Sequence, residues 1–220
     1  QLCRWNYDVI LRERESGLEV GLEEDERGAY IMNSKDLCLM PRLREVLESN
    51  ADSLKIEGRN RSEYYVGSVV RAYRNAIDSY FADPGNFDSK PFMDDLNVLE
   101  SRGYTDAFFD GKLGPDAHNY ETTRSDSDYQ AAGVITNIMD DYFVMELRNE
   151  IKQGDEINFI LPHTMEKVPV VLDKIINDKN GDELPKMSAG QNNSLRIPKS
   201  LVDKKYLDKF EPLILGYKKK

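Results

Sequence analysis

Hydrophobic residues follow a different rhythm in the two parts of this sequence. An apolar run at 29–32 and a strictly alternating run at 53–57 have the period of β-strands. Apolar residues recur at three-to-four spacing over 37–47 and 66–80, which predicts two amphipathic helices. The order strand, helix, strand, helix favours parallel strands joined by crossover helices. We therefore predict the C-terminal part of a (β/α) barrel-like domain here.

Short β-type runs replace this pattern near the C-terminus. They occupy residues 133–135, 142–145, 156–160 and 167–171, with turn-forming residues between them. Regularly spaced short strands predict a small antiparallel β-barrel or sandwich. The pattern of residues 134–157 resembles the second-domain barrel of translation elongation factors. The predicted fold class is thus α/β followed by all-β.

These patterns predict a division of the chain into three parts. Residues 1–28 are polar and charged, and we interpret them as an irregular connector arm. Residues 29–124 form the α/β part, and residues 125–220 form the small β-barrel domain. The final Lys218–Lys220 is interpreted as a solvated tail. Since the first residue is Gln1 and not Met, we expect a piece of a longer protein.

Composition narrows the setting and the partners. No run approaches the roughly 20 apolar residues of a membrane helix, and no signal peptide is visible, so we expect no membrane association. The two cysteines, Cys3 and Cys38, do not make a disulfide framework, which favours a cytoplasmic location, although one bridge between them stays open. The net charge of −10 opposes general polyanion binding, so RNA contact would need a local basic patch.

The alternating run leads into the main candidate site. On a strand, Lys55 and Glu57 point to the side opposite Leu54. If the apolar side packs against helices, Lys55 and Glu57 face the barrel interior, with Gly58 and Arg59 at the C-terminal end of the strand, where α/β barrels place active sites. We predict a catalytic group of Lys55, Glu57 and Arg59, with Gly58 letting the backbone approach a ligand. A buried ion pair with a purely structural role is the alternative.

Two further groups are candidates for substrate contact. Asn33, Ser34 and Lys35 end the neighbouring predicted strand and would face the same rim, although Ser34 and Asp36 also suit helix capping. Tyr64 begins an aromatic and basic series that either binds nucleic acid or packs in a helix core. The other members of that series are Tyr65, Arg71, Tyr73, Arg74 and Tyr80.

Hydrolytic chemistry has little support in the residue pattern. His118 and His163 do not lie near a plausible nucleophile in the sequence, and we interpret both as surface histidines. Neither a nucleophile elbow nor an HExxH motif is present. Cys3 is a single thiolate, and iron–sulfur clusters generally use four. Cys38 lies among apolar residues and is predicted to be a core thiol.

Three stretches together resemble one known family. They are Cys3-Arg4-Trp5, Tyr30–Leu37 and Ser53–Arg59, the last followed by Tyr64-Tyr65-Val66. The resemblance is to the collagenase-like peptidases of unknown catalytic type, family number 32, and within it to the tRNA wobble-uridine hydroxylation proteins. It runs from Cys3 to about Asp78 and continues more loosely beyond.

This resemblance implies a (β/α) barrel-like domain followed by a small β-barrel. It also implies iron–sulfur chemistry in the full-length protein, with Cys3 matching the last cysteine of the family's cluster. The other cysteines of that cluster are missing here, so we expect no complete cluster in this chain and no activity from it alone. The implied reaction is hydroxylation of a tRNA uridine to 5-hydroxyuridine.

Three functions follow as hypotheses. The first is tRNA hydroxylation, with tRNA as the partner. The second is a protease or collagenase acting on a peptide substrate, with its catalytic group supplied from outside this chain. The third is a non-enzymatic RNA- or protein-binding module formed by the barrel, residues 129–217. The sequence does not predict the oligomeric state.

Overall fold

A computed structural model describes most of the chain, and the described residues gather into two compact units. The described residues are 10–12, 14, 17, 19–21, 23–25, 28–30, 34–111, 117, 119, 125–190 and 193–220. The first unit is drawn from residues 1–37 and 101–125, and the second from residues 38–100 and 126–220.

The first unit contains three short strand pairs. Two are antiparallel and one is parallel: β1 (Ile10–Arg12) with β2 (Glu19–Gly21), β3 (Glu23–Asp25) with β4 (Gly28–Tyr30), and the parallel pair β5 (Asp36–Leu37) with β6 (Tyr104–Thr105). The described part of the predicted irregular arm therefore contains two hairpins. The parallel pair joins two segments that are almost 70 residues apart in the sequence, as its register Asp36↔Tyr104 shows.

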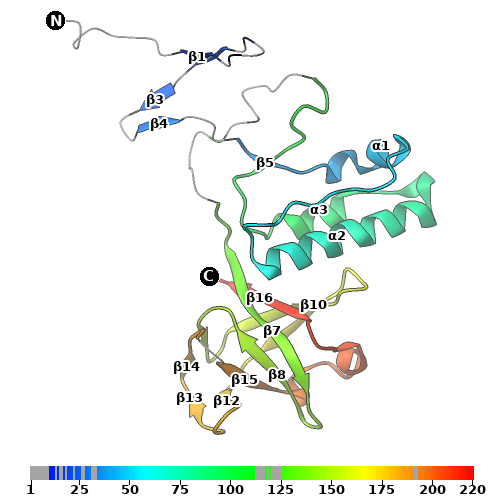
Figure 1. The fold of residues 1–220 in the computed structure, drawn as a ribbon. Helices are drawn as coiled ribbons and strands as arrows, with labels where there is room; N and C mark the ends of the chain where they lie inside the picture. The colour runs from blue at the N-terminus through cyan, green and yellow to red at the C-terminus, as the bar shows by residue number, and fades with distance from the viewer. Residues whose placement is uncertain are drawn as a thin grey trace, which may run out of the picture. The chain divides into compact units, whose positions relative to one another are not determined.

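The second unit begins with a small helical layer. Its elements are η2 (Met40–Arg42), α1 (Leu43–Glu48), α2 (Glu63–Ala82), η3 (Pro84–Asn86) and α3 (Lys90–Leu96). Helix α2 contains the predicted range 66–80 and begins slightly before it, where Ser62 Oγ accepts a hydrogen bond from the Tyr65 N–H at 3.2 Å. Helices α2 and α3 lie side by side (Figure 1). None of the helices in the described ranges combines the length and hydrophobicity needed to cross a bilayer.

The predicted strand at 53–57 is wrong for this structure. Residues 53–58 have no regular secondary structure. A strand requires a hydrogen-bonded neighbour, and no strand of the described residues pairs with this segment. The residues do alternate between polar and apolar, but alternation alone does not provide a neighbouring strand to pair with.

The rest of the second unit is a curled antiparallel sheet of eight strands (Figure 1). Its spatial order is β11-β10-β16-β7-β8-β15-β12-β13. The strands are β7 (Tyr129–Ile138), β8 (Tyr142–Leu147), β10 (Glu156–Ile160), β11 (Lys167–Val171), β12 (Ile175–Asn177), β13 (Glu183–Leu184), β15 (Ser194–Pro198) and β16 (Leu215–Lys219). A separate pair joins β9 (Ile151–Lys152) to β14 (Lys186–Met187). All four β-type runs predicted from the sequence are confirmed as strands.

The concave side of this sheet holds the largest hydrophobic core. Phe143 and Phe159 are fully buried, and the Phe210 ring stacks on Phe143 with centroids 4.5 Å apart. Phe210 follows the 3-10 helices η5 (Lys199–Leu201) and η6 (Lys204–Lys209), whose Leu201 and Leu207 also pack against the core. The sheet therefore has its own apolar interior, and its closure into a full barrel stays a prediction.

The predicted solvated tail is correct for the exposed Lys219 and Lys220 but wrong for Lys218. Strand β16 lies between β10 and β7, so Lys218 is paired with Gln130 and only 7% exposed. Its ammonium contacts Asp155 Oδ2 at 2.5 Å. A lysine-rich run was interpreted as solvated because of its charge, but the buried partner was not visible in the local sequence.

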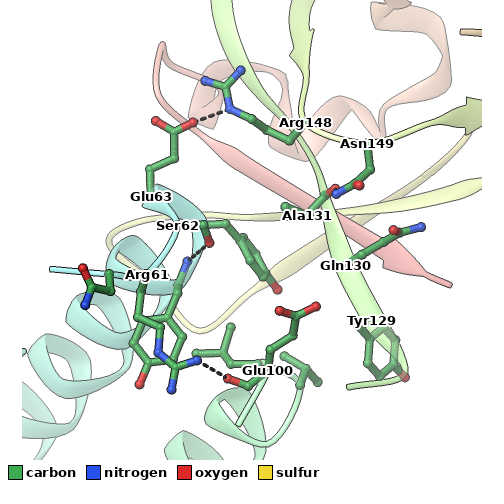
Figure 2. A pocket seen from close by; sticks show the side chains of 14 residues that line it. Arg61, Ser62, Glu63, Glu100, Tyr129, Gln130, Ala131, Arg148 and Asn149 are labelled. Carbon is green, nitrogen blue, oxygen red and sulfur yellow. Dashed lines mark hydrogen bonds and ion pairs between the residues drawn. The ribbon is translucent and has the colours of Figure 1, made fainter. Parts of the chain in front are cut away.

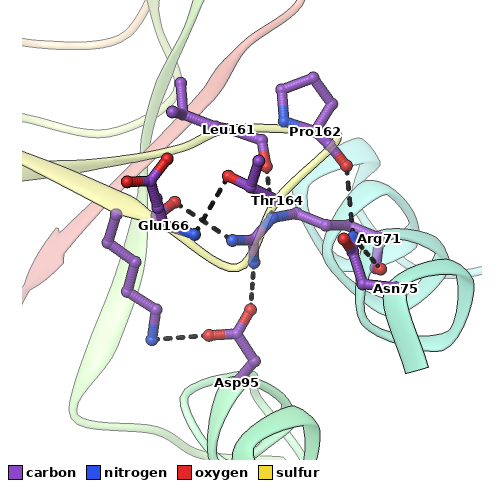
Figure 3. A network of polar contacts seen from close by, with 8 residues as sticks. Arg71, Asn75, Asp95, Leu161, Pro162, Thr164 and Glu166 are labelled. Atoms are coloured by element: carbon purple, nitrogen blue, oxygen red, sulfur yellow. Dashed lines mark hydrogen bonds and ion pairs between the residues drawn. The ribbon is translucent and has the colours of Figure 1, made fainter. Parts of the chain in front are cut away.

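An ionic network joins the helices to the sheet (Figure 3). Arg71 of α2 is 4% exposed and pairs with Asp95 of α3, which also contacts Lys167 Nζ at 2.6 Å. The Arg71 guanidinium further donates to the carbonyls of Leu161 at 2.7 Å and Glu166 at 3.2 Å. Burial is the largest single effect and opposes the charge of Lys167, but the hydrogen bond and charge of Asp95 together with Tyr217 outweigh it, so the pKa of Lys167 is raised. The network thus fixes the β10–β11 hairpin onto the helical layer.

Removing Asp95 should destabilise the chain strongly. In Asp95→Ala, the buried Arg71 loses its counter-charge, and we expect the free energy of unfolding to fall by about 3–5 kcal/mol. Urea denaturation measures this change. The neighbouring Asp94→Ala is the matched control, because Asp94 is exposed. Equal stability of the two variants would contradict the role of the network.

The terminal strand makes a second prediction. Lys218→Met should lower the free energy of unfolding by about 1–3 kcal/mol, because Asp155 loses its buried partner. The exposed Lys219→Met provides the control and should change stability by less than about 0.5 kcal/mol. Thermal unfolding followed by circular dichroism compares them. A Lys218 variant as stable as the control would restore the interpretation as a free tail.

Candidate functional site

The predicted catalytic residues lie on an exposed segment. Lys55, Glu57 and Arg59 are all exposed, and Leu54 is 38% exposed. The expected inward-facing Lys–Glu pair is therefore not formed within this chain. Its absence has the same reason as that of the strand, because no described strand pairs with the segment. A catalytic role for the three residues stays a prediction.

A tight turn follows this segment. Glu57 Oε1 accepts a hydrogen bond from the Arg59 N–H at 2.8 Å, and the Arg61 N–H donates to the Gly58 carbonyl at 2.9 Å. A Cβ added at Gly58 would lie 2.6 Å from Val66 Cγ2 of helix α2. Close packing on the helix therefore requires glycine at this position, independently of any contact with a ligand.

The second predicted group lies in the first compact unit. Asn33 is outside the described residues, whereas the Lys35 N–H donates to the Ala117 carbonyl at 2.8 Å. The capping interpretation of Asp36 is wrong, because its carboxylate accepts two bonds from Arg102, at 2.8 and 3.1 Å. Ser34 provides no helix cap either, since η2 begins after Leu39 without a side-chain cap. That Ser34 and Lys35 share a rim with Lys55 stays a prediction.

Most members of the aromatic and basic series on α2 pack in the interior. Tyr64 and Tyr80 are buried, and Arg71 belongs to the ionic network. The Tyr73 hydroxyl lies 3.7 Å from Cys38 Sγ and accepts from the Leu39 N–H at 3.1 Å. Burial raises the pKa of Tyr64, whose ring lies 6.0 Å from that of Tyr217. Helix core packing is thus observed for four members of the series, whereas Tyr65 is half-buried and Arg74 is exposed.

The structure describes two of the four residues considered for metal and hydrolytic chemistry. Cys3 and His118 are outside the described residues. Cys38 is a free, buried thiol with a pKa raised by burial, as predicted for a core cysteine. His163 is 87% exposed and lies 3.5 Å from Glu211, as predicted for a surface histidine. Since an iron–sulfur cluster needs several thiolates, the described residues do not fit one.

A cleft of about 530 Å³ opens directly after the candidate segment (Figure 2). One wall is the start of α2, from Asn60 to Tyr65, together with Glu100. The other wall is the start of β7, from Tyr129 to Ala131, with Arg148 and Asn149 after β8. Tyr64 is the predicted substrate-binding residue that lies on this cleft. The volume is in the range of small-molecule sites.

Arginine, tyrosine and amide groups dominate the polar lining of the cleft. The Arg61 guanidinium lies over the Tyr65 ring, 4.8 Å from its centroid. Arg148 pairs with Glu63 across the cleft and with Glu146 at 2.7 Å. The hydrogen bond to Glu63 outweighs partial burial and raises the pKa of Arg148. The cleft therefore offers flat aromatic surface, fixed cations and neutral amides together.

Sequence reasoning missed this cleft. Its walls come from residues near 61, 100, 130 and 148, which are brought together by the packing of α2 on the sheet. The sequence feature nearest to the cleft is the pair Tyr64-Tyr65 of the aromatic and basic series. This pair lies on one wall of the cleft. Gln130 and Arg148 carry no motif that could have found them.

Both parts of the sequence match models of one protein family. Residues 1–119 match the profile of peptidase family U32, and residues 127–207 match the peptidase family U32 C-terminal domain. The chain belongs to peptidase family U32. This confirms the family resemblance predicted from the three motifs.

The relatives of this chain include proteins named for tRNA hydroxylation and proteins named collagenase. The chain is 35% identical over 214 residues to tRNA hydroxylation protein P1 of Bacillus subtilis, covering 93% of this chain and 47% of that protein. It is 33% identical over 124 residues to a collagenase of Porphyromonas gingivalis, covering 54% of this chain and 28% of that one. The chain thus spans about half the length or less of these relatives.

One solved structure is also similar. The C-terminal domain of a Geobacillus thermoleovorans U32 peptidase matches with a TM-score of 0.33 and 21% identity. The match covers 40% of this chain and 91% of that domain.

A steric test separates packing from ligand binding at Gly58. Gly58→Ala should destabilise the chain by about 1–3 kcal/mol, because the new methyl group overlaps Val66 Cγ2. Val66→Ala removes that atom, so the double variant should be less destabilised than the sum of the single variants. Urea denaturation of all four forms gives the coupling. Strict additivity would show that the contact with Val66 does not set the requirement for glycine.

Proposed function

We propose that this chain is the C-terminal part of a U32 protein that takes part in the hydroxylation of a tRNA uridine. The observation that carries the proposal is the 35% identity to a tRNA hydroxylation protein over 93% of the chain. This similarity includes both compact units and thus both the candidate segment and the cleft. A cytoplasmic location and tRNA as partner follow from the same proposal.

The exposed segment supplies the local positive charge that an acidic chain needs for RNA. Lys55, Arg59 and Arg61 fall within seven residues, and Lys55 and Arg59 are exposed. Phosphate neutralisation provides most of the affinity for nucleic acid. In this proposal, Lys55 and Arg59 contact the RNA backbone, and the Glu57 carboxylate accepts a proton from the substrate. Asn33, Ser34 and Lys35 contribute further contacts in the full-length protein.

The proposed cofactor is an iron–sulfur cluster of the full-length protein, with Cys3 as one ligand. Such a cluster would supply redox chemistry when bound. The other ligands would come from residues outside this chain, because Cys38 is enclosed by Tyr73 and Met93 in the helix core. This chain then contributes substrate contacts, and none of its described residues needs to hold the metal.

Peptide cleavage is the second candidate function. The collagenase relative of 33% identity favours it. Incubation of metal-replete full-length protein with gelatin, with and without a chelator, tests this function. Cleavage that the chelator abolishes would support it, and intact gelatin would count against it. The third function, binding by the barrel alone, is tested by salt-dependent tRNA binding to residues 129–217.

The proposed reaction predicts a loss of modification. In the full-length protein, Glu57→Gln should abolish 5-hydroxyuridine in cellular tRNA, because the amide cannot accept a proton. Mass spectrometry of digested tRNA from a deletion strain carrying each variant measures the nucleoside. Glu45→Gln, at an exposed position on α1, is the control and should leave modification unchanged. Full modification with Glu57→Gln would remove Glu57 from the site.

A further inference from the structure

We propose that the cleft between α2 and β7 holds the base of one unpaired RNA nucleotide. This inference rests on the proposed function and names the part of the RNA that this chain would bind. A base inside a duplex cannot enter a cleft of this kind, whereas the bases of loops are free to turn outward. The occupant is therefore a nucleotide of a single-stranded loop.

The cleft has flat surfaces suited to a base on both walls. Arg61 and Tyr65 form a stacked pair on the helix side. Tyr129 stands on the strand side (Figure 2), with its ring held edge-on against Tyr217 at 5.6 Å between centroids. Proteins bind unstacked bases between aromatic rings and arginine planes in this way. Both walls are fixed by other contacts, so little order has to be gained on binding.

The amides of the cleft suit the edge of a base. Asn149 Nδ2 donates to the Ala131 carbonyl at 2.9 Å, and its Oδ1 is an acceptor on the same lining residue. The Gln130 side chain, on the same wall, offers both a donor and an acceptor. A uracil edge presents one N–H between two carbonyls, which such amides complement.

The charges at the mouth suit the attached phosphate. Arg148 is 32% exposed, and its partner Glu63 is 56% exposed. A phosphate arriving at the mouth can take the place of Glu63, because Arg148 keeps its second partner, Glu146. The candidate segment 53–59 leads into the same wall, so the backbone of the RNA has further cations along its path.

A peptide is a poorer match for the same cleft. Peptides usually add as a strand to an open sheet edge or lay a helix in an apolar groove. At the start of β7, the Tyr129 N–H already donates to Ser127 Oγ at 3.1 Å, and the Ala131 carbonyl is taken by Asn149. These bonds leave no row of unpaired backbone groups for a peptide strand.

Binding of a labelled RNA stem-loop to the full-length protein tests the inference. Fluorescence anisotropy compares a stem-loop that has a uridine-containing loop with the same sequence fully base-paired. The double variant Arg61→Ala/Gln130→Ala should bind the stem-loop about tenfold more weakly or worse. The control Arg12→Ala/Gln153→Ala changes the same residue types at exposed positions that do not line the cleft and should bind like wild type.

Two further measurements test the inference if the double variant is unstable. Arg61→Lys keeps the charge but not the flat guanidinium, so weaker stem-loop binding by this variant supports stacking. Unchanged affinity in both Arg61 variants overturns the inference, as does equal binding of the paired RNA. Displacement of the stem-loop by a gelatin peptide would assign the cleft to a peptide and would also overturn it.

Modified tRNA from cells distinguishes this inference from the proposed function. If the wild-type protein restores 5-hydroxyuridine but the cleft variants bind RNA normally, the inference fails and the function stands. If the wild-type protein restores no modification but the cleft variants lose stem-loop binding, the function fails and the cleft remains an RNA site.

Discussion

The buried pairing of Arg71 with Asp95 is the interaction on which the second compact unit depends. One guanidinium holds a carboxylate of α3 and two carbonyls of the β10–β11 hairpin, and the same carboxylate holds Lys167. Charges this deeply buried are tolerated only when every partner is in place. The network therefore forms only when all of its groups are in place, and it fixes the position of α2 on the sheet.

The cleft exists because this ionic network fixes α2 on the sheet. Glu63 and Arg61 at the start of α2 meet Arg148 and Gln130 of the sheet only because the helix is fixed two turns further on, at Arg71. Leu215 of β16 lies so close to Gly67 that a Cβ there would be 2.6 Å from it. Close packing and a buried ion pair thus place aromatic, cationic and amide groups around one space.

Several elements were predictable because their causes are local. Helix α2 has an apolar repeat, and the predicted range 66–80 lies within the observed helix. Strands β7, β8, β10 and β11 were predicted from short apolar runs between turns. The candidate site was predictable only in part, since Tyr64 lies on the cleft but Gln130 and Arg148 are distant in sequence. The segment 53–57 shows the limit, because alternation indicates a strand but pairing makes one.

By itself, the sequence determined the family, the helix α2, the core position of Cys38 and the strand content of the C-terminal part. These properties depend on motifs, periodicity and side-chain polarity, which act over a few residues. Only the tertiary structure decided that Lys218 is buried in a central strand, that Asp36 pairs with Arg102, and that a cleft exists at all. Burial and ion pairing join residues far apart in the chain, and no local pattern records which partners will meet.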